Sequence, residues 1–143
     1  MNTTIKNYLT AEQSATLIAK GISADKASMV RLDFNGTYAY VSGEEAQSVR
    51  DCVNGQFYVE ECRVFALADI TALLPNELST DTIMCDNDIC PISIRWDKNC
   101  QKWFVGYDLV PRPVGVGVDS ELIDALYSLL CWTIEKGYID LTK

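Results

Sequence analysis

This chain of 143 residues contains six cysteines, whose thiols could bind a metal or act as nucleophiles. Cys85 and Cys90 stand closest together, with acidic residues between them. Structural zinc needs four ligands, usually as two closely spaced pairs. Cys52 and Cys62 are too far apart in the sequence to form the second pair. The spacing therefore favours a turn with two small buried thiols, and we expect no metal and no cofactor.

The chain contains no histidine, which is the general base of many common enzymes. Ser-His-Asp and Cys-His nucleophiles are thereby excluded. Cys62 adjoins Arg63, but neighbours in a strand point to opposite faces, so this arginine does not activate the thiol. Carboxylate pairs carry no signal among 20 acidic residues. We expect no enzyme; a small enzyme using carboxylate or cysteine chemistry and a small-ligand-binding module are the alternatives.

A glycine-rich stretch before the last predicted helix is a further candidate for chemistry. Gly115 and Gly117 precede a helix start, where backbone amides can hold an anion. The third glycine position of a dinucleotide motif is Ser120, and the acidic Asp119 and Glu121 already occupy the positive helix end. We expect a flexible lead-in loop at 115–117.

The charge of the chain argues against nucleic acid as a partner. Twenty acidic and twelve basic residues give a net charge of −8, which opposes binding to phosphates. The excess lies in residues 44–88, which hold ten acids against Arg50 and Arg63. Two interpretations stay open: a solvated face that aids solubility, or a patch for a basic partner. The candidate patch residues are Glu44, Glu45, Asp51, Glu60 and Glu61.

The first predicted elements are a capped helix and a hairpin. Thr10 and Gln13 form a capping-box pattern, and apolar residues then recur at helical spacing over 10–20, up to Gly21. Residues 29–41 alternate with period two around an Asn-Gly turn, which predicts a hairpin.

The register of this hairpin places its polar and aromatic residues on one face. Arg31 is then opposite Tyr40, and Asp33 is opposite Tyr38. Tyrosine and arginine are enriched at protein interfaces, so Arg31, Tyr38 and Tyr40 are the candidate partner-binding residues. The alternative is that segment 44–65 covers this face.

The rest of the chain predicts further helices and a second hairpin. Ile92, Ile94 and Trp96 alternate before a turn, and Trp103, Val105 and Tyr107 alternate after it, so we expect one apolar face that helices cover. Asp119 and Ser120 cap a last helix that runs to about Lys136 and ends at Gly137. Shorter elements are expected at 44–53 (helix), 56–59 and 63–65 (strands), and 68–74 (helix).

Several stretches also carry a family resemblance: 9–14 (LTAEQS) with 17–18 (LI) and 21–22 (GI), 27–30 (ASMV), 65–70 (FALADI) with 73–75 (LLP), and 121–127 (ELIDALY) through Trp132 to 137–138 (GY). In these stretches the chain resembles a diffuse group of small proteins encoded in gut Bacteroidetes genomes and in their phages and mobile elements. The resemblance implies an intracellular accessory protein and supplies no catalytic residue. Residues 43–62 and 85–91 depart from the shorter members of the group.

These observations predict one α+β domain over 1–143, with antiparallel hairpins packed against the N- and C-terminal helices. No apolar leader and no membrane span is expected, so we expect a cytoplasmic protein with reduced thiols. The predicted function is a non-enzymatic accessory or regulatory module, monomeric or homodimeric, that binds a protein partner.

Overall fold

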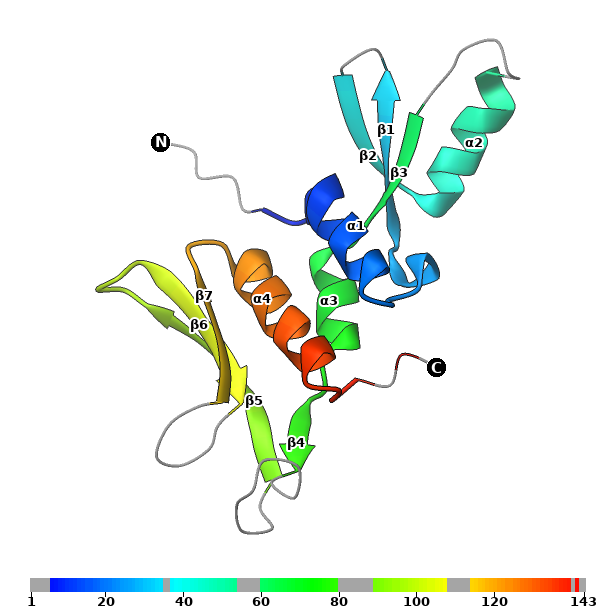
Figure 1. The fold of residues 1–143 in the computed structure, drawn as a ribbon. Coiled ribbons are helices and arrows are strands. Elements are labelled where there is room, and N and C mark those ends of the chain that lie inside the picture. The colour runs from blue at the N-terminus through cyan, green and yellow to red at the C-terminus, as the bar shows by residue number, and fades with distance from the viewer. Residues whose placement is uncertain are drawn as a thin grey trace. The chain divides into compact units, whose positions relative to one another are not determined.

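The computed structural model describes residues 6–34, 37–53, 60–79, 89–107, 114–139 and 141. Within these ranges, the side chains at 34, 37, 49–53, 60–61, 79, 89–90 and 114–115 lie outside the description. The elements in chain order (Figure 1) are α1 (Ala11–Ala19), the 3-10 turn η1 (Ala24–Lys26), β1 (Met29–Phe34), β2 (Thr37–Ser42), α2 (Gly43–Val53), β3 (Glu60–Val64), α3 (Leu67–Leu73), β4 (Glu77–Ser79), β5 (Ile89–Asp97), β6 (Lys102–Tyr107), β7 (Val114–Asp119) and α4 (Leu122–Glu135).

The predicted α+β fold with antiparallel hairpins is confirmed, and the two hairpins lie in two separate sheets. The strand orders are β2-β1-β3 and β4-β5-β6-β7, and every pairing is antiparallel. Backbone contacts divide the chain into two compact units. We call Tyr8–Asp69 the N-terminal unit, and Ile70–Lys143 together with Met1–Asn7 the C-terminal unit.

The N-terminal unit begins with the predicted capped helix. The Gln13 backbone N–H donates to Thr10 Oγ1 at 3.0 Å, and the Thr10 N–H donates to Gln13 Oε1 at 2.9 Å, so the capping box is confirmed. Gly21 follows the helix with φ +113°, a conformation that favours glycine. The hairpin β1–β2 has the predicted register, in which Val30 pairs with Val41.

A third strand and a helix complete this sheet. The predicted strand 63–65 is β3, which pairs with the other edge of β1 and begins earlier, at Glu60. The predicted strand at 56–59 lies outside the described residues. Helix α2 buries Ala46 against Val30 and Leu32, with Val41 beside them. The apolar face of the hairpin is therefore covered by α2.

The C-terminal unit has the second hairpin in its predicted register. Trp96 pairs with Trp103, and Ile94 pairs with Val105. Helix α4 packs on the adjoining strands, where Val105 and Tyr107 are fully buried. The turn is closed by Asp97, whose Oδ1 accepts from the backbone N–H groups of Asn99 (2.9 Å) and Cys100 (3.2 Å).

The lead-in loop predicted at 115–117 is wrong, because these residues belong to strand β7. Gly117 is required for packing instead. A Cβ placed on it would lie 2.2 Å from the Ala125 carbonyl oxygen of α4 and 3.1 Å from Val105 Cγ2. The missing side chain lets α4 lie directly on the sheet.

The start of α4 also differs from the prediction. Its N-cap is Glu121, which makes no side-chain cap hydrogen bond, and the helix begins at Leu122. Asp119, the predicted cap, accepts from the Glu121 N–H at 3.0 Å and so shapes the preceding turn. The predicted end of this helix is confirmed, because α4 ends at Glu135 and Gly137 follows it with φ +78°. None of the described helices is long and apolar enough to cross a membrane.

Candidate functional site

The candidate site in the N-terminal unit is the face of the β2-β1-β3 sheet that α2 does not cover. Strand alternation separates Arg31 from its covered neighbours Val30 and Leu32, and the register places it opposite Tyr40. Tyr38 is 51% exposed and Tyr40 is 40% exposed. The sequence had left open whether segment 44–65 covers this face. In the described part of that segment, α2 packs on the opposite face and β3 extends the sheet at its edge, while residues 54–59 lie outside the description.

Both exposed rings are held in place by a neighbouring side chain. The guanidinium carbon of Arg31 lies 4.2 Å from the centroid of the Tyr38 ring, a cation–π contact. The Tyr40 ring stacks on Tyr8, with centroids 5.1 Å apart and planes 1° from parallel. We call Tyr8, Arg31, Tyr38 and Tyr40 the tyrosine–arginine face.

Tyr8 is the member of this face that sequence reasoning missed. It lies 32 positions from Tyr40 in the chain, and no local pattern links the two. The backbone positions it: Tyr8 forms an isolated antiparallel bridge with Ala66, and the next N–H, of Leu9, donates to Phe65 O at 2.9 Å. Only this long-range bridge brings a third tyrosine to the sheet.

Arg31 has an unusual hydrogen-bonding state. Its Nε is buried and has no hydrogen-bond partner among the described residues. A buried donor without an acceptor costs about 1–3 kcal/mol. The cation–π contact with Tyr38 offsets part of this cost, since such contacts contribute about 0.5–2 kcal/mol. Arg31 therefore adds little to the stability of the fold that holds it.

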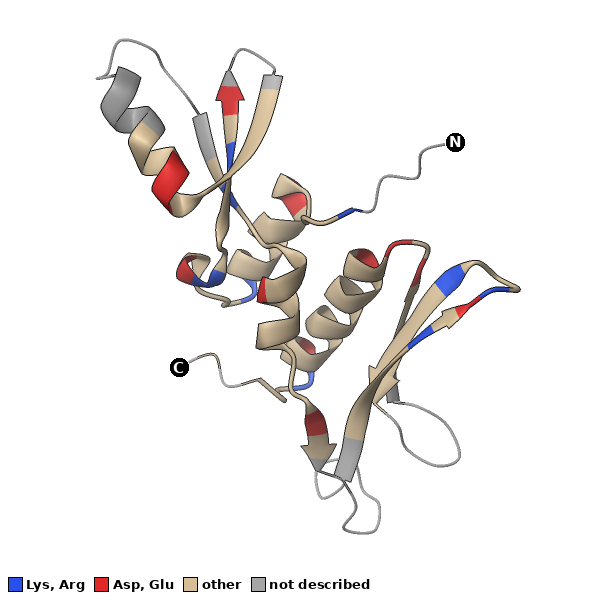
Figure 2. Ribbon diagram, turned by 180° about the vertical axis from the view of Figure 1, so that it is seen from behind, with Lys and Arg blue, Asp and Glu red and all other residues tan. Residues whose placement is uncertain are grey.

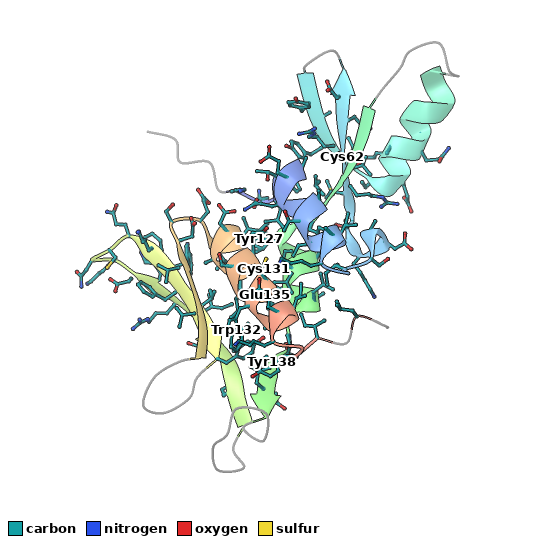
Figure 3. The ribbon with its side chains drawn as sticks, in the orientation of Figure 1. Cys62, Tyr127, Cys131, Trp132, Glu135 and Tyr138 are labelled. Carbon is teal, nitrogen blue, oxygen red and sulfur yellow. The ribbon has the colours of Figure 1, made fainter. Side chains whose placement is uncertain are left out.

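Cys62 lies next to this face, on β3 (Figure 3). The register places it opposite Arg31, whereas Arg63 donates from Nη1 to Ala27 O at 3.1 Å. The expectation that Arg63 does not face the Cys62 thiol agrees with this contact. The Arg31 guanidinium, which contacts the Tyr38 ring, is therefore the cation on the strand position opposite Cys62.

The predicted acidic patch is described only in part. Glu44 and Glu45 are exposed in the first turn of α2, where negative charge interacts favourably with the helix dipole. The Glu45 N–H donates to Ser42 Oγ at 3.1 Å. The side chains of Asp51, Glu60 and Glu61 lie outside the described residues. Because α2 covers the apolar face of the sheet, its two exposed glutamates belong to the side opposite the tyrosine–arginine face.

Cysteine chemistry in the C-terminal unit would centre on α4. Tyr127, Cys131 and Glu135 follow one another at four-residue intervals along this helix (Figure 3), so they share one side of it. Nearby, Trp132 packs on Tyr138 with ring centroids 5.3 Å apart, which closes the end of the helix.

The buried tyrosine of this unit has a structural role. Tyr107 donates its hydroxyl hydrogen to Pro75 O at 2.7 Å, and burial raises the pKa of its phenol far above the ordinary value near 10. It therefore stays protonated and is not a catalytic base. In the described part of the chain, no three cysteine or acidic residues are grouped as metal ligands. Cys85 lies outside that part, as does the side chain of Cys90.

Comparison with known proteins gives no match to a protein-family model, to a curated protein or to a solved structure.

Proposed function

We propose that this chain is a non-enzymatic accessory module that binds another protein through the tyrosine–arginine face. The observation that carries the proposal is that Tyr38 and Tyr40 are both exposed and that each ring packs on a neighbouring side chain. An exposed side chain usually loses rotamer freedom on binding, at a cost of about 0.5–1.5 kcal/mol. Stacking on Arg31 and Tyr8 removes part of this cost before a partner arrives.

The chemistry of the face fits a protein partner. Tyrosine and arginine dominate the binding energy of protein interfaces, because each offers a large flat surface together with a polar group. The three tyrosines and Arg31 provide such surface on a sheet, which is a rigid support. The partner surface that fits best is apolar and flat, with a carboxylate or carbonyl to accept from the guanidinium.

Arg31 supports the proposal in a second way. A residue that leaves a buried donor unpaired costs stability, and such residues are found where function requires them. An apolar residue of similar length would remove this cost. We therefore expect Arg31 to matter more for binding than for folding.

The acidic residues add a long-range component to this proposal. Glu44 and Glu45 lie on the other side of the sheet, so they attract a partner that is basic overall without entering the contact. Their effect belongs in the association rate and decreases with salt. The proposed location of the protein is the cytoplasm, in agreement with the free thiols of Cys62 and Cys100.

Site-directed crosslinking tests the proposal. The full chain is expressed in its source cells with the photocrosslinker p-benzoylphenylalanine in place of Tyr38, Tyr40 or, as a matched control, Ile18. Ile18 is an apolar side chain of the same unit. Its exposed fraction, 38%, is similar to the 40% of Tyr40. Mass spectrometry then identifies the crosslinked protein. A partner captured equally well from position 18 contradicts the proposal.

Affinity measurements with the purified partner complete the test. Tyr38→Ala, Tyr40→Ala and Arg31→Met are each expected to weaken binding at least about tenfold, which corresponds to about 1.4 kcal/mol. Ile18→Ala is expected to leave the Kd within about twofold. Arg31→Met should leave the free energy of unfolding within about 0.5 kcal/mol or raise it. An unchanged Kd in the three variants would remove this face as the binding surface.

A further inference from the structure

Among the residues that the structure describes, strand β5 in the C-terminal unit has a free edge over its second half. β4 pairs only with its first three residues, Ile89–Pro91, and the Ile92 N–H then donates to Asn76 O at 2.8 Å. Beyond Ile92, no described residue pairs with β5 on the side away from β6. Residues 93–97 therefore form an edge strand.

The backbone groups that face this edge can be assigned from the bond to Asn76. It shows that the N–H of Ile92 points away from β6, and the direction of backbone groups alternates along a strand. The N–H and C=O groups of Ile94 and Trp96 therefore point to the free edge as well. These two residues present four backbone groups in the arrangement that another antiparallel strand requires.

The same two residues carry exposed apolar side chains. Ile94 is 45% exposed and Trp96 is 44% exposed, although they lie on the same face as the buried Val105 and Tyr107. The Trp96 ring packs on Trp103, with centroids 5.2 Å apart and planes at 57°. An uncovered edge with large apolar side chains is a surface that proteins usually protect, because it recruits further strands.

The charge pattern of the edge determines which strand fits. Arg95 lies between Ile94 and Trp96 and points to the other face, where its guanidinium carbon is 5.4 Å from the Phe104 ring centroid. Lys98 and Lys102 lie at the tip of the same hairpin, which Figure 2 shows as blue segments. A second copy paired with Ile94 opposite Trp96 would place Arg95 against Arg95, and like charges directly opposite destabilise a pair. Pairing Trp96 with Trp96 instead would set Arg95 against Asp97, but it would set Ile94 against Lys98, which lies beyond the end of β5. An acidic residue opposite Arg95 stabilises a pair.

We propose that the free edge of β5 binds an extended segment of another protein as an added antiparallel strand, and that this segment has an acidic residue between two apolar ones. The apolar side chains lie beside Ile94 and Trp96, and the acidic side chain lies beside Arg95. Backbone hydrogen bonds to residues 94 and 96 provide affinity, and the charge provides selectivity. This binding surface belongs to the C-terminal unit and does not depend on the tyrosine–arginine face.

The opposite edge of this sheet, β7, provides the contrast. Val116 and Val118 are 47% and 41% exposed, so β7 offers a similar apolar surface. The residue between them is Gly117, which carries no charge to select a partner. Variants of these two valines are therefore matched controls for variants of Ile94 and Trp96.

A peptide titration tests the proposal. The probe is the acetylated and amidated peptide Thr-Val-Glu-Val-Thr, and its counterpart has Lys in place of Glu. Nuclear magnetic resonance of the full ¹⁵N-labelled chain follows the amides. With the Glu peptide we expect shifts along β5, and at least about tenfold slower hydrogen exchange at the amides of Ile94 and Trp96 than in the free chain. The Lys peptide should bind at least about tenfold more weakly.

Three variants separate the possible outcomes. Arg95→Glu should reverse the preference so that the Lys peptide binds better. Ile94→Thr with Trp96→Thr should abolish binding, whereas Val116→Thr with Val118→Thr should leave it within about twofold. Equal binding of both peptides, or shifts confined to β7, overturns the proposal. A concentration-dependent dimer in analytical ultracentrifugation that the Ile94 and Trp96 variant loses would assign the edge to a second copy, and so also overturns it.

Discussion

The two sheets start from the same local element, a β-hairpin with alternating apolar side chains, and they differ in what is left uncovered. In the N-terminal unit, α2 covers the apolar face of β1–β2, and the exposed side carries Arg31, Tyr38 and Tyr40 in stacked contacts. In the C-terminal unit, α4 packs on β6 and β7, while Ile94 and Trp96 of β5 stay exposed. One sheet displays ordered side chains on a face, and the other displays backbone groups at an edge.

This difference teaches that alternation and coverage are separate properties. Alternation decides which residues share a face of a strand, and it is the same in both hairpins. Coverage depends on where a helix from elsewhere in the chain packs. The two proposed surfaces therefore use different physics: side-chain recognition on the first sheet, and strand addition on the second.

The largest effect is expected from a substitution that removes the space in which a helix packs on its sheet. Gly117→Ala forces a Cβ against the Ala125 carbonyl oxygen, so we expect the C-terminal unit to lose about 3 kcal/mol or more of unfolding free energy. Gly43→Ala is the control, because its Cβ would meet only Arg63 Nη1 at 4.0 Å. Urea unfolding followed by tryptophan fluorescence measures the loss in the C-terminal unit, since Trp96, Trp103 and Trp132 all belong to it, and hydrogen exchange of the β1 amides measures the control in the N-terminal unit.

This experiment also shows whether the two units are independent. Hydrogen exchange of amides in β1 reports on the N-terminal unit in the same variant. If the units unfold separately, protection in β1 is unchanged by Gly117→Ala. A parallel loss of protection in β1 would mean that the two sheets form one cooperative unit, and the comparison between them would apply to their surfaces only.

A smaller effect is expected from the buried tyrosine of the C-terminal unit. Tyr107→Phe removes the hydrogen bond to Pro75 O and should cost about 1.5 kcal/mol. Tyr38→Phe, at an exposed position of the other sheet, should stay within about 0.5 kcal/mol. Urea unfolding at pH 8 measures both. Equal losses in the two variants would contradict the contrast between a structural and a surface tyrosine.

Tyr107 also makes the stability of the C-terminal unit depend on pH in the alkaline range. Burial raises the pKa of Tyr107 in the folded chain, so the folded state binds the phenolic proton more tightly than the unfolded state does. Its contribution is complete below the unfolded pKa near 10 and is lost as the pH rises from there towards the folded pKa. Unfolding free energy should therefore decline above pH 10, and less steeply in Tyr107→Phe. Parallel pH profiles for the two proteins would contradict this assignment.

The smallest stability effects are expected at the residues that precede helices α1 and α4. Thr10→Ala removes the capping box of α1 and should cost the N-terminal unit about 1 kcal/mol, while Thr10→Ser should keep most of it. Glu121→Ala removes no cap hydrogen bond at the start of α4 but only the one that Glu121 Oε2 accepts from the Lys6 N–H at 3.2 Å, so it should cost less than Thr10→Ala, about 0.5 kcal/mol. Thermal unfolding by circular dichroism, with hydrogen exchange assigning the loss to a unit, measures the difference. A larger loss in Glu121→Ala would be the contrary result.

Local features of the fold could be predicted because neighbouring residues determine them. The capping box at Thr10 and the register of both hairpins involve hydrogen bonds and alternation within a few positions of the chain. The ends of α1 and α4 are marked by Gly21 and Gly137, whose positive φ angles disfavour other residues. These predictions needed no knowledge of distant contacts.

The candidate site could be predicted only in part. Alternation placed Arg31, Tyr38 and Tyr40 on one face, but Tyr8 joins them through a backbone bridge to Ala66, which no local pattern indicates. The sequence predicts a lead-in loop at 115–117 because these residues precede a helix start and do not complete a dinucleotide motif. The close approach of α4 explains Gly117, and that helix follows in the sequence without a signal for where it packs.

The sequence by itself determined the elements, their registers and the composition of each strand face, because these depend on short-range hydrogen bonds and on the period of two along a strand. The tertiary structure alone decided which faces and edges stay at the surface. Two helices, α2 and α4, cover one part of each sheet and leave Tyr38, Tyr40, Ile94 and Trp96 exposed. The physical reason is that burial depends on how whole elements pack against one another, which the local pattern of each element does not determine, and both proposed binding surfaces are what that packing leaves open.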